Sequence, residues 1–224
     1  LFGTDGHKYV VTLGPASSYQ LDIFNANGDA LLLSTNGVLA GSGAIPWHND
    51  YAFRVDAAKE TILEAHRLPA DGGPCTCFLD MYAAYEGLRP SLRDRIDGLD
   101  IEHTFLFTFG AFLDEEQKAK MLEEYPPPTH PMVCTHDVTG RKHLYANRNF
   151  ASHVIGMDPD ESKALIDLVC RQADYPEYQC RFRWEPHSVA FWDNRAVQHY
   201  ASSDYWPQAR IMERASVIGT RPHR

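Results

Sequence analysis

The sequence predicts a mainly β protein with added helices, arranged as a β-sandwich or a barrel. Two observations predict this class: strand-like segments dominate the C-terminal part of the chain, and three helical patterns occur earlier. The 224 residues, with 44% hydrophobic content, are enough to bury one sizeable core. We therefore expect a single domain over residues 1–224. Because the first residue is not Met, we also expect that an N-terminal start and some loops are absent from the chain as given.

Three segments carry the helical patterns. Residues 80–98 place apolar side chains three and four apart, and Pro90 interrupts them. Residues 113–125 are polar and end at a run of prolines, whereas residues 158–173 begin with an aspartate N-cap followed by proline and acidic residues. Residues 57–68 are ambiguous, because their composition favours a helix while their periodicity does not decide between helix and strand.

Several segments are typical of strands. Residues 31–33 and 101–109 are apolar or aromatic runs bounded by turn residues. Residues 188–192 and 197–200 flank a short polar turn and predict a hairpin. Residues 210–218 alternate strictly, so every second side chain should share one face of the strand.

Charge and cysteine usage exclude several classes of protein. The net charge of −9 argues against a nucleic-acid groove, which needs a basic stripe. No segment approaches the roughly 20 consecutive apolar residues that cross a bilayer, and the N-terminal residues lack a signal-peptide pattern. An odd number of cysteines is a poor disulfide framework and is typical of reduced thiols. We therefore expect a cytoplasmic protein that binds neither nucleic acid nor membrane. Its five cysteines, expected to be structural, are Cys75, Cys77, Cys134, Cys170 and Cys180.

The first candidate metal ligands are His48 and Asp50. A His-x-Asp triplet places an imidazole and a carboxylate on one side of an extended segment, where both can bind one metal ion. A third ligand from elsewhere would complete a facial triad and leave positions open for a cosubstrate and O2. Taken alone the triplet is weak evidence, because a chain rich in His and Asp contains about one such triplet by chance.

The second candidate is His199, in the strand that follows the predicted hairpin turn. A lone strand histidine is more often a core residue than a ligand. However, Arg210 and Arg214 follow on the alternating strand, on one face and about 13 Å apart. Two interpretations stay open: exposed arginines on an edge strand, or a pocket that binds carboxylates through two-pronged guanidinium contacts.

Four ordered blocks of the sequence carry a resemblance to a known family. They read WHND from Trp47, LPADGGPCTCFLDMYAAYEGL from Leu68, HPMVCTHDVTGRKHLYANRNF from His130 and RFRWEPHSVAFWDNRAVQHYASSDYWPQARIMERASVIGTRP from Arg181. Over residues 46–222 these blocks resemble the taurine dioxygenase and chlorophenoxyacetate dioxygenase family of Fe(II)- and 2-oxoglutarate-dependent dioxygenases.

The resemblance implies a fold and an activity. The fold is a double-stranded β-helix, the jelly-roll core of cupin-like proteins, and it implies a strand over residues 61–68 against their helix propensity. The activity is hydroxylation or oxidative cleavage of a small, anionic organic substrate, with Fe(II), 2-oxoglutarate as cosubstrate and O2, releasing succinate and CO2. Dimers or tetramers are common among the proteins it resembles, so a homo-oligomer is expected.

Carried over residue by residue, the resemblance implies that His48, Asp50 and His199 are the iron ligands and form the catalytic centre. It implies that Arg210 holds the distal carboxylate of 2-oxoglutarate, and that Thr76 contacts the same cosubstrate after a one-residue insertion in its block.

The resemblance also bears on the substrate. It places Arg214 beside both the cosubstrate and an anionic group of the substrate. Where taurine-specific members carry Asn, four residues before the first ligand, this chain has Ala44, which puts sulfonate recognition in doubt.

Two rival functions remain open: a zinc-dependent hydrolase that uses the same His-Asp-His set, and a non-catalytic jelly-roll binding protein. The hydrolase does not explain the two arginines, and intact ligands argue against loss of catalysis.

Two further groups are ambiguous. The aromatic residues Phe150, Phe191 and Trp192 either line the site or form core. A histidine cluster is interpreted as a solvated loop with structural contacts rather than a second metal site: His130, His136 and His143.

Overall fold

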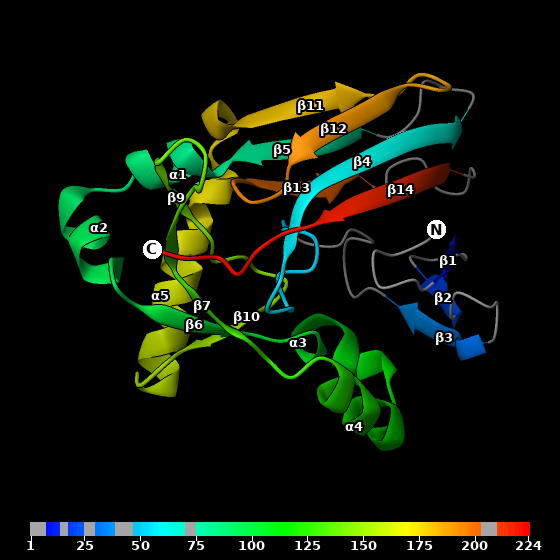
Figure 1. Cartoon of the computed structure of the whole chain (residues 1–224), viewed down its shortest axis with the longest axis horizontal. Coiled ribbons are helices and arrows are strands. Elements are labelled where there is room, and N and C mark those ends of the chain that lie inside the picture. Colours follow the sequence, from blue (N-terminus) through cyan, green and yellow to red (C-terminus); the bar gives the residue numbers. More distant parts are fainter. Residues whose placement is uncertain (1–7, 14–17, 25–29, 39–46, 70–74, 203–209) are drawn as a thin grey trace.

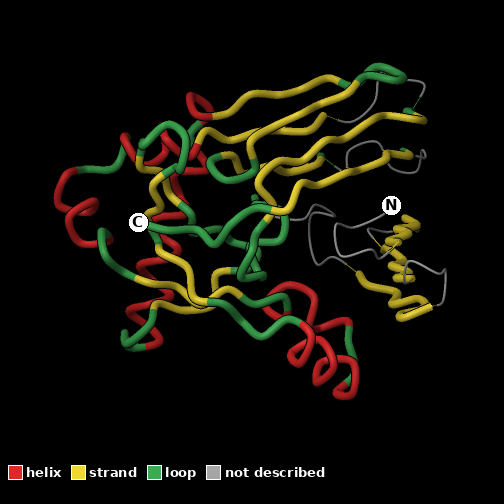
Figure 2. Tube along the Cα trace, viewed as in Figure 1, coloured by secondary structure: helices red, strands yellow, loops and turns green. Residues whose placement is uncertain are grey.

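The computed structural model describes residues 8–13, 18–24, 30–38, 47–69, 75–202 and 210–224. This part of the chain is built mainly from small antiparallel sheets, with helices on the left and at the bottom of the view (Figures 1 and 2). The strands are β1 Lys8–Leu13, β2 Ser18–Phe24, β3 Ala30–Val38, β4 Ala58–Arg67, β5 Cys75–Asp80, β6 Asp100–His103, β7 Thr129–Pro131, β8 Val133–Thr135, β9 Lys142–Leu144, β10 Ala151–Val154, β11 Gln179–Arg183, β12 Val189–Asp193, β13 Val197–Ala201 and β14 Ile211–Ile218. The α-helices are α1 Met81–Glu86, α2 Pro90–Ile96, α3 Leu106–Phe109, α4 Glu115–Glu124 and α5 Pro159–Cys170, with 3-10 turns at Gly110–Phe112, Arg171–Asp174 and Pro176–Tyr178.

Two three-stranded sheets form the centre of the described fold. One has the order β11-β5-β13 and the other β12-β4-β14, with antiparallel pairing throughout. An apolar cluster draws residues from both sheets, so the sheets pack face to face. Its buried members are Ala65, Trp184, Ala190 and Trp192.

A second core joins the helices to the sheet β10-β6-β7. Helix α5 lies beside β10 and β6, with α1 and α2 close by at the same end of the molecule (Figure 1). Fully buried side chains such as Ile96 on α2, Ile101 on β6 and Val169 on α5 fill the space between them. This core also contains Leu79 of β5, so it packs against one end of the sheet β11-β5-β13. No helix in the described ranges is long and apolar enough to cross a membrane.

The helical predictions are confirmed. The segment 80–98 is divided at Pro90 into α1 and α2, and the polar segment 113–125 contains α4. Helix α5 begins after its predicted N-cap, Asp158, whose side chain accepts hydrogen bonds from two backbone N–H groups of the first turn. These ends follow from local chemistry, because a carboxylate satisfies N–H groups that a helix start leaves without partners.

Two segments differ from what their local sequence favours. Residues 57–68, of helix-favouring composition, form the central strand β4, as the family resemblance implied. Strand β4 pairs with β12 on one side and β14 on the other, so tertiary pairing overrides local propensity. The strand predicted over 101–109 ends at His103, and helix α3 follows it. The rings of Phe105 and Phe109, one turn apart, stack at 4.6 Å, which favours the helical conformation.

The alternation predicted for residues 210–218 is confirmed over most of its length. In β14, Met212 and Arg214 are half-buried, whereas Ile211 and Glu213 are exposed. The alternation fails at the end, because a register shift separates Val217 from Ile218 and leaves Ile218 54% exposed.

Candidate metal centre

The first and third predicted ligands lie on adjacent backbones. His48 and His199 form an isolated antiparallel bridge, in which His48 N donates to His199 O at 3.1 Å and His199 N donates to His48 O at 2.9 Å. Strand β13, which carries His199, is itself paired with β5. Two residues that are distant in the sequence are therefore fixed side by side by backbone hydrogen bonds.

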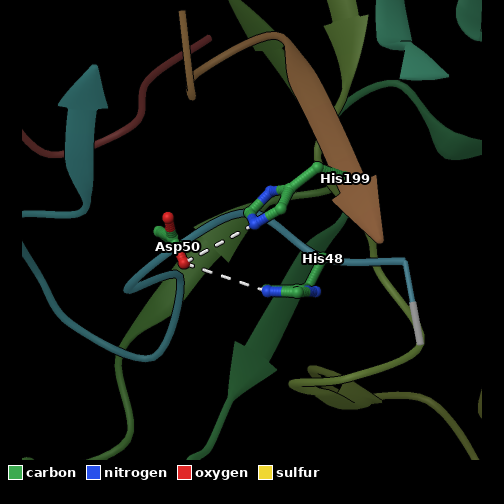
Figure 3. Close-up of side chains that lie close together, drawn as sticks. All are labelled: His48, Asp50 and His199. Carbon is green, nitrogen blue, oxygen red and sulfur yellow. Dashed lines mark ion pairs between the residues drawn. The ribbon is translucent and has the colours of Figure 1, made fainter. Parts of the chain in front are cut away.

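The three predicted ligands converge on one point. Figure 3 shows both imidazoles directed toward the Asp50 carboxylate. Asp50 Oδ1 lies 3.8 Å from His48 Nε2 and 3.9 Å from His199 Nε2, and all three ligand atoms lie within 4.8 Å of one another. Ligands at bond lengths of about 2.1 Å and right angles lie about 3 Å apart, so side-chain shifts of about 1 Å bring this set onto a metal ion.

Asp50 is buried and held at both carboxylate oxygens. Thr61 Oγ1 donates to Oδ2 at 3.1 Å, and Arg214 Nη1 donates to Oδ1 at 2.8 Å. Burial raises the pKa of Asp50, but the charges of Arg214, His199 and His48 and the Thr61 hydrogen bond outweigh it and lower the pKa to about 2. The carboxylate is therefore ionised, as a metal ligand must be.

His199 is held in its neutral form. Burial, together with the neighbouring His48, lowers the pKa of His199 to about 3, although Asp50 acts in the opposite direction. Because the imidazole lone pair that binds a metal exists only in the neutral ring, this environment prepares His199 as a ligand.

An asparagine that the sequence did not single out fixes the loop that presents Asp50. Asn194 Oδ1 accepts from Asp50 N at 2.8 Å, and Asn194 Nδ2 donates to Asp50 O at 3.0 Å and to Ala58 O at 2.8 Å. In return, Asn49 Nδ2 donates to Asn194 O at 2.8 Å. The turn that precedes His199 thus holds the Asp50 backbone on both sides. Asparagine is common in such turns, so no sequence signal marked this role.

The cosubstrate residues predicted from the resemblance also come together. Arg210 Nη2 lies 3.2 Å from Thr76 Oγ1 and donates to it. Trp184 Nε1, which the sequence did not indicate, donates to the same oxygen at 2.9 Å. Thr76 and Trp184 are almost completely buried, with exposed fractions of 1% and 3%.

Trp192 and Phe150 are core residues that also lie beside the candidate ligands, whereas Phe191 meets neither interpretation. The Trp192 ring lies 4.9 Å from that of His199, and the Phe150 ring lies 6.3 Å from that of His48, so both border the centre. Phe191 is 66% exposed and belongs to neither wall nor core, because alternation along β12 turns it outward.

The histidine cluster is not a solvated loop, so that prediction is wrong. His130, His136 and His143 are 0%, 4% and 2% exposed, because the hairpin β8–β9 and its surroundings fold over them. Their contacts are structural, as expected: His136 Nε2, for example, lies 2.8 Å from Asp193 Oδ2. All five cysteines are free in the structure. Ala44 and the insertion before Thr76 lie outside the described residues.

Antiparallel sheets that bring two imidazoles and one carboxylate within ligand distance define a candidate centre of the two-histidine, one-carboxylate class. The chain belongs to the family described as Taurine catabolism dioxygenase TauD, TfdA family, whose model matches residues 12–216. This membership confirms the resemblance drawn from the four sequence blocks.

Individual relatives agree with the family match. An alpha-ketoglutarate-dependent 2,4-dichlorophenoxyacetate dioxygenase of Cupriavidus pinatubonensis is 35% identical, over 77% of this chain and 59% of that protein. An alpha-ketoglutarate-dependent sulfate ester dioxygenase of Pseudomonas putida is 32% identical, over 88% of this chain and 66% of that protein. The solved structure of AAD-2 in complex with Mn(II) and N-oxalylglycine superposes with a TM-score of 0.72 and 31% identity, covering 80% of this chain and 70% of that one. The chain spans about half to two thirds of the length of the curated relatives it matches.

Proposed function

We propose that this chain is an Fe(II)- and 2-oxoglutarate-dependent dioxygenase that hydroxylates or oxidatively cleaves a small anionic organic substrate, releasing succinate and CO2. The observation that carries the proposal is the convergence of His48, Asp50 and His199 within ligand distance. Two imidazoles and one carboxylate are the donor set that non-haem Fe(II) oxygenases use, with the remaining positions open.

The residues of the centre fit iron in charge as well as in position. The low pKa values of Asp50 and His199 keep both groups in their metal-binding forms across the physiological pH range. Thr61 and Asn194 fix the side chain and the backbone of Asp50, which is the kind of outer support that ligating carboxylates need. Iron with bound 2-oxoglutarate supplies the activation of O2 and the oxidation of a substrate C–H bond.

Thr76 and Arg210 are the residues that would hold the distal carboxylate of 2-oxoglutarate. A guanidinium and a hydroxyl 3.2 Å apart offer N–H and O–H donors to one carboxylate. By fixing the far end of the diacid, they would leave its other end free to bind the metal. Trp192 and Phe150 place apolar rings beside His199 and His48, which would help to exclude bulk water from the ligands.

The position of the Arg214 side chain supports the proposal of an anionic substrate. Its side chain is 28% exposed, whereas the Asp50 side chain that it contacts is 5% exposed, so Arg214 lies on the more open side of the carboxylate. A guanidinium there offers charge-assisted hydrogen bonds to an entering anion. The names of two relatives agree, since 2,4-dichlorophenoxyacetate and sulfate esters are anions.

The finer points of fold and location belong to the same proposal. The face-to-face sheets β11-β5-β13 and β12-β4-β14, with the ligands on and beside β13, support a double-stranded β-helix. Five free thiols support a reducing compartment such as the cytoplasm.

The test begins with anaerobic addition of Fe(II) and 2-oxoglutarate, which should produce a visible metal-to-ligand charge-transfer band. His199→Ala should abolish the band because iron is lost, whereas Arg210→Ala should retain iron and bind 2-oxoglutarate more weakly. Succinate release and O2 uptake with a panel of aryloxyacids, sulfonates, alkyl sulfates and amino acids then identify the substrate. Turnover without O2 and 2-oxoglutarate would instead support the hydrolase, and equal 2-oxoglutarate affinity in Arg210→Ala would remove Arg210 from its role.

A further inference from the structure

We propose that Trp184 is a positioning residue for the cosubstrate, which makes the Thr76 hydroxyl an obligate hydrogen-bond donor toward the distal carboxylate of 2-oxoglutarate. The inference rests on the proposed function and adds to it a residue that neither the ligand set nor the sequence indicated. Its evidence is the pair of N–H groups that meet at one buried oxygen, Thr76 Oγ1.

The hydrogen-bond capacity of a hydroxyl decides the argument. A threonine hydroxyl has two acceptor lone pairs and one hydrogen to donate. At Thr76 both lone pairs are in use, one by Trp184 Nε1–H at 2.9 Å and one by Arg210 Nη2–H at 3.2 Å. The hydroxyl hydrogen must then point away from both donors, and among the described residues no acceptor receives it. A carboxylate, which only accepts, is the group that such a hydrogen binds.

Trp184 has no alternative role for its N–H. An indole nitrogen only donates, and a buried one that lacks an acceptor is costly. Trp184 is 3% exposed, and Thr76 Oγ1 is the acceptor that the described structure provides. Two neighbours contact its ring: Phe182 packs edge-on at 4.8 Å, and the Arg210 guanidinium lies 5.8 Å from the ring centroid. The N–H is therefore aimed by packing and does not adjust to the ligand.

The consequence is a site prepared for a carboxylate before the cosubstrate arrives. If Trp184 did not donate, the free lone pair of Thr76 would let the hydroxyl rotate between donor and acceptor orientations. With Trp184 in place, the hydroxyl and Arg210 both present donors, so part of the ordering cost of binding is already met. A ligand without the distal carboxylate gains nothing from this arrangement.

A double-mutant cycle tests the inference. The variants are Trp184→Phe, which keeps an aromatic ring and removes the N–H, Thr76→Val, which removes the hydroxyl, and the double variant. The measurement is the Kd of 2-oxoglutarate for Mn(II)-loaded protein by calorimetry. We expect Kd to rise about tenfold in Thr76→Val and about three- to tenfold in Trp184→Phe. In the Thr76→Val background, Trp184→Phe should change Kd by less than about twofold.

Two comparisons separate this effect from general damage. Binding of 2-oxopentanoate, which lacks the distal carboxylate, should be equal in wild type and Trp184→Phe. Ser162→Ala removes a hydroxyl that accepts from Val154 N in the core beneath α5, and it should leave the Kd of 2-oxoglutarate unchanged.

The outcomes are distinct. An unchanged Kd in Trp184→Phe, or an equal loss with and without the Thr76 hydroxyl, overturns the role of Trp184 while the proposed function stands. Failure of the wild-type protein to bind 2-oxoglutarate with Mn(II) or Fe(II) overturns both.

Discussion

Replacement of Asn194 tests how the fold builds the metal centre. Asn194→Ala removes three buried hydrogen bonds, which join its side chain to the backbone N and O of Asp50 and to Ala58 O. Each bond contributes about 1–1.5 kcal/mol, and the backbone groups left behind are buried, so the free energy of unfolding should fall by about 3–5 kcal/mol. Because the lost bonds also orient the Asp50 backbone, metal affinity should fall on the order of 10- to 100-fold.

The assay separates these two effects. Chemical unfolding in the absence of metal gives the stability change, and titration of the folded variant with Mn(II) or Co(II) gives the affinity. Asn194→Asp is a matched second variant of the same size, which keeps an acceptor for Asp50 N but cannot donate to Asp50 O or Ala58 O.

Ser162→Ala is the control for stability alone. Ser162 is buried in α5, far from the ligands in the fold, and its hydroxyl accepts from Val154 N at 2.7 Å. Its loss should cost about 1–2 kcal/mol with unchanged metal affinity. The reasoning is refuted if folded Asn194→Ala binds metal as tightly as wild type, or if Ser162→Ala weakens metal binding equally.

Three further predictions follow from the electrostatics of buried groups. Thr61→Val, isosteric but without the hydroxyl that donates to Asp50 Oδ2, should weaken metal binding about tenfold by titration, and an unchanged affinity would contradict the support assigned to Thr61. Arg214→Met leaves the buried Asp50 carboxylate without its partner cation, so the melting temperature of the metal-free protein should fall. Mn(II) should restore most of this loss, because a metal ion at Asp50 Oδ1 replaces the lost positive charge. An equal fall in melting temperature with Mn(II) bound would argue against metal binding at Oδ1. Lowering the pH from 7 to 5 should reduce the free energy of unfolding by about 2 kcal/mol per buried histidine, because burial lowers their pKa values to about 3 or 4 and the unfolded chain then binds protons first. This stability is lost as the pH falls below about 6.5, whereas carboxylates of lowered pKa change the stability little between pH 7 and 5. A free energy of unfolding by urea that does not change between pH 7 and 5 would contradict the burial of these histidines. These histidines are His103, His130, His143 and, in the metal-free protein, His199.

Local chemistry fixed much of what the sequence predicted correctly. Asp158 marks the start of α5 because its carboxylate caps the first turn, and Pro90 divides α1 from α2 because proline starts a helix but does not continue one. Alternation along β14 placed Met212 and Arg214 on one face. The residue types at positions 48, 50 and 199 indicated a metal once the family resemblance joined them.

Other features were decided by the tertiary structure. Strand β4 has a helix-favouring composition and becomes a strand because β12 and β14 pair with it on both sides. The histidines at 130, 136 and 143 have a polar sequence context, yet they are buried, and contacts within the fold hold them: His130 Nε2 lies 2.9 Å from Arg54 O, and His136 Nε2 lies 2.8 Å from Asp193 Oδ2.

The sequence by itself determined where helices begin and which side chains share a strand face, and it predicted which groups bind a metal and a diacid. The tertiary structure decided how those groups are held. Asn194 is 144 residues from Asp50 and Trp184 is 108 residues from Thr76, and neither contact follows from local periodicity or capping. The physical reason is that a hydrogen bond between distant residues depends on the register of the sheets, which the whole chain sets together.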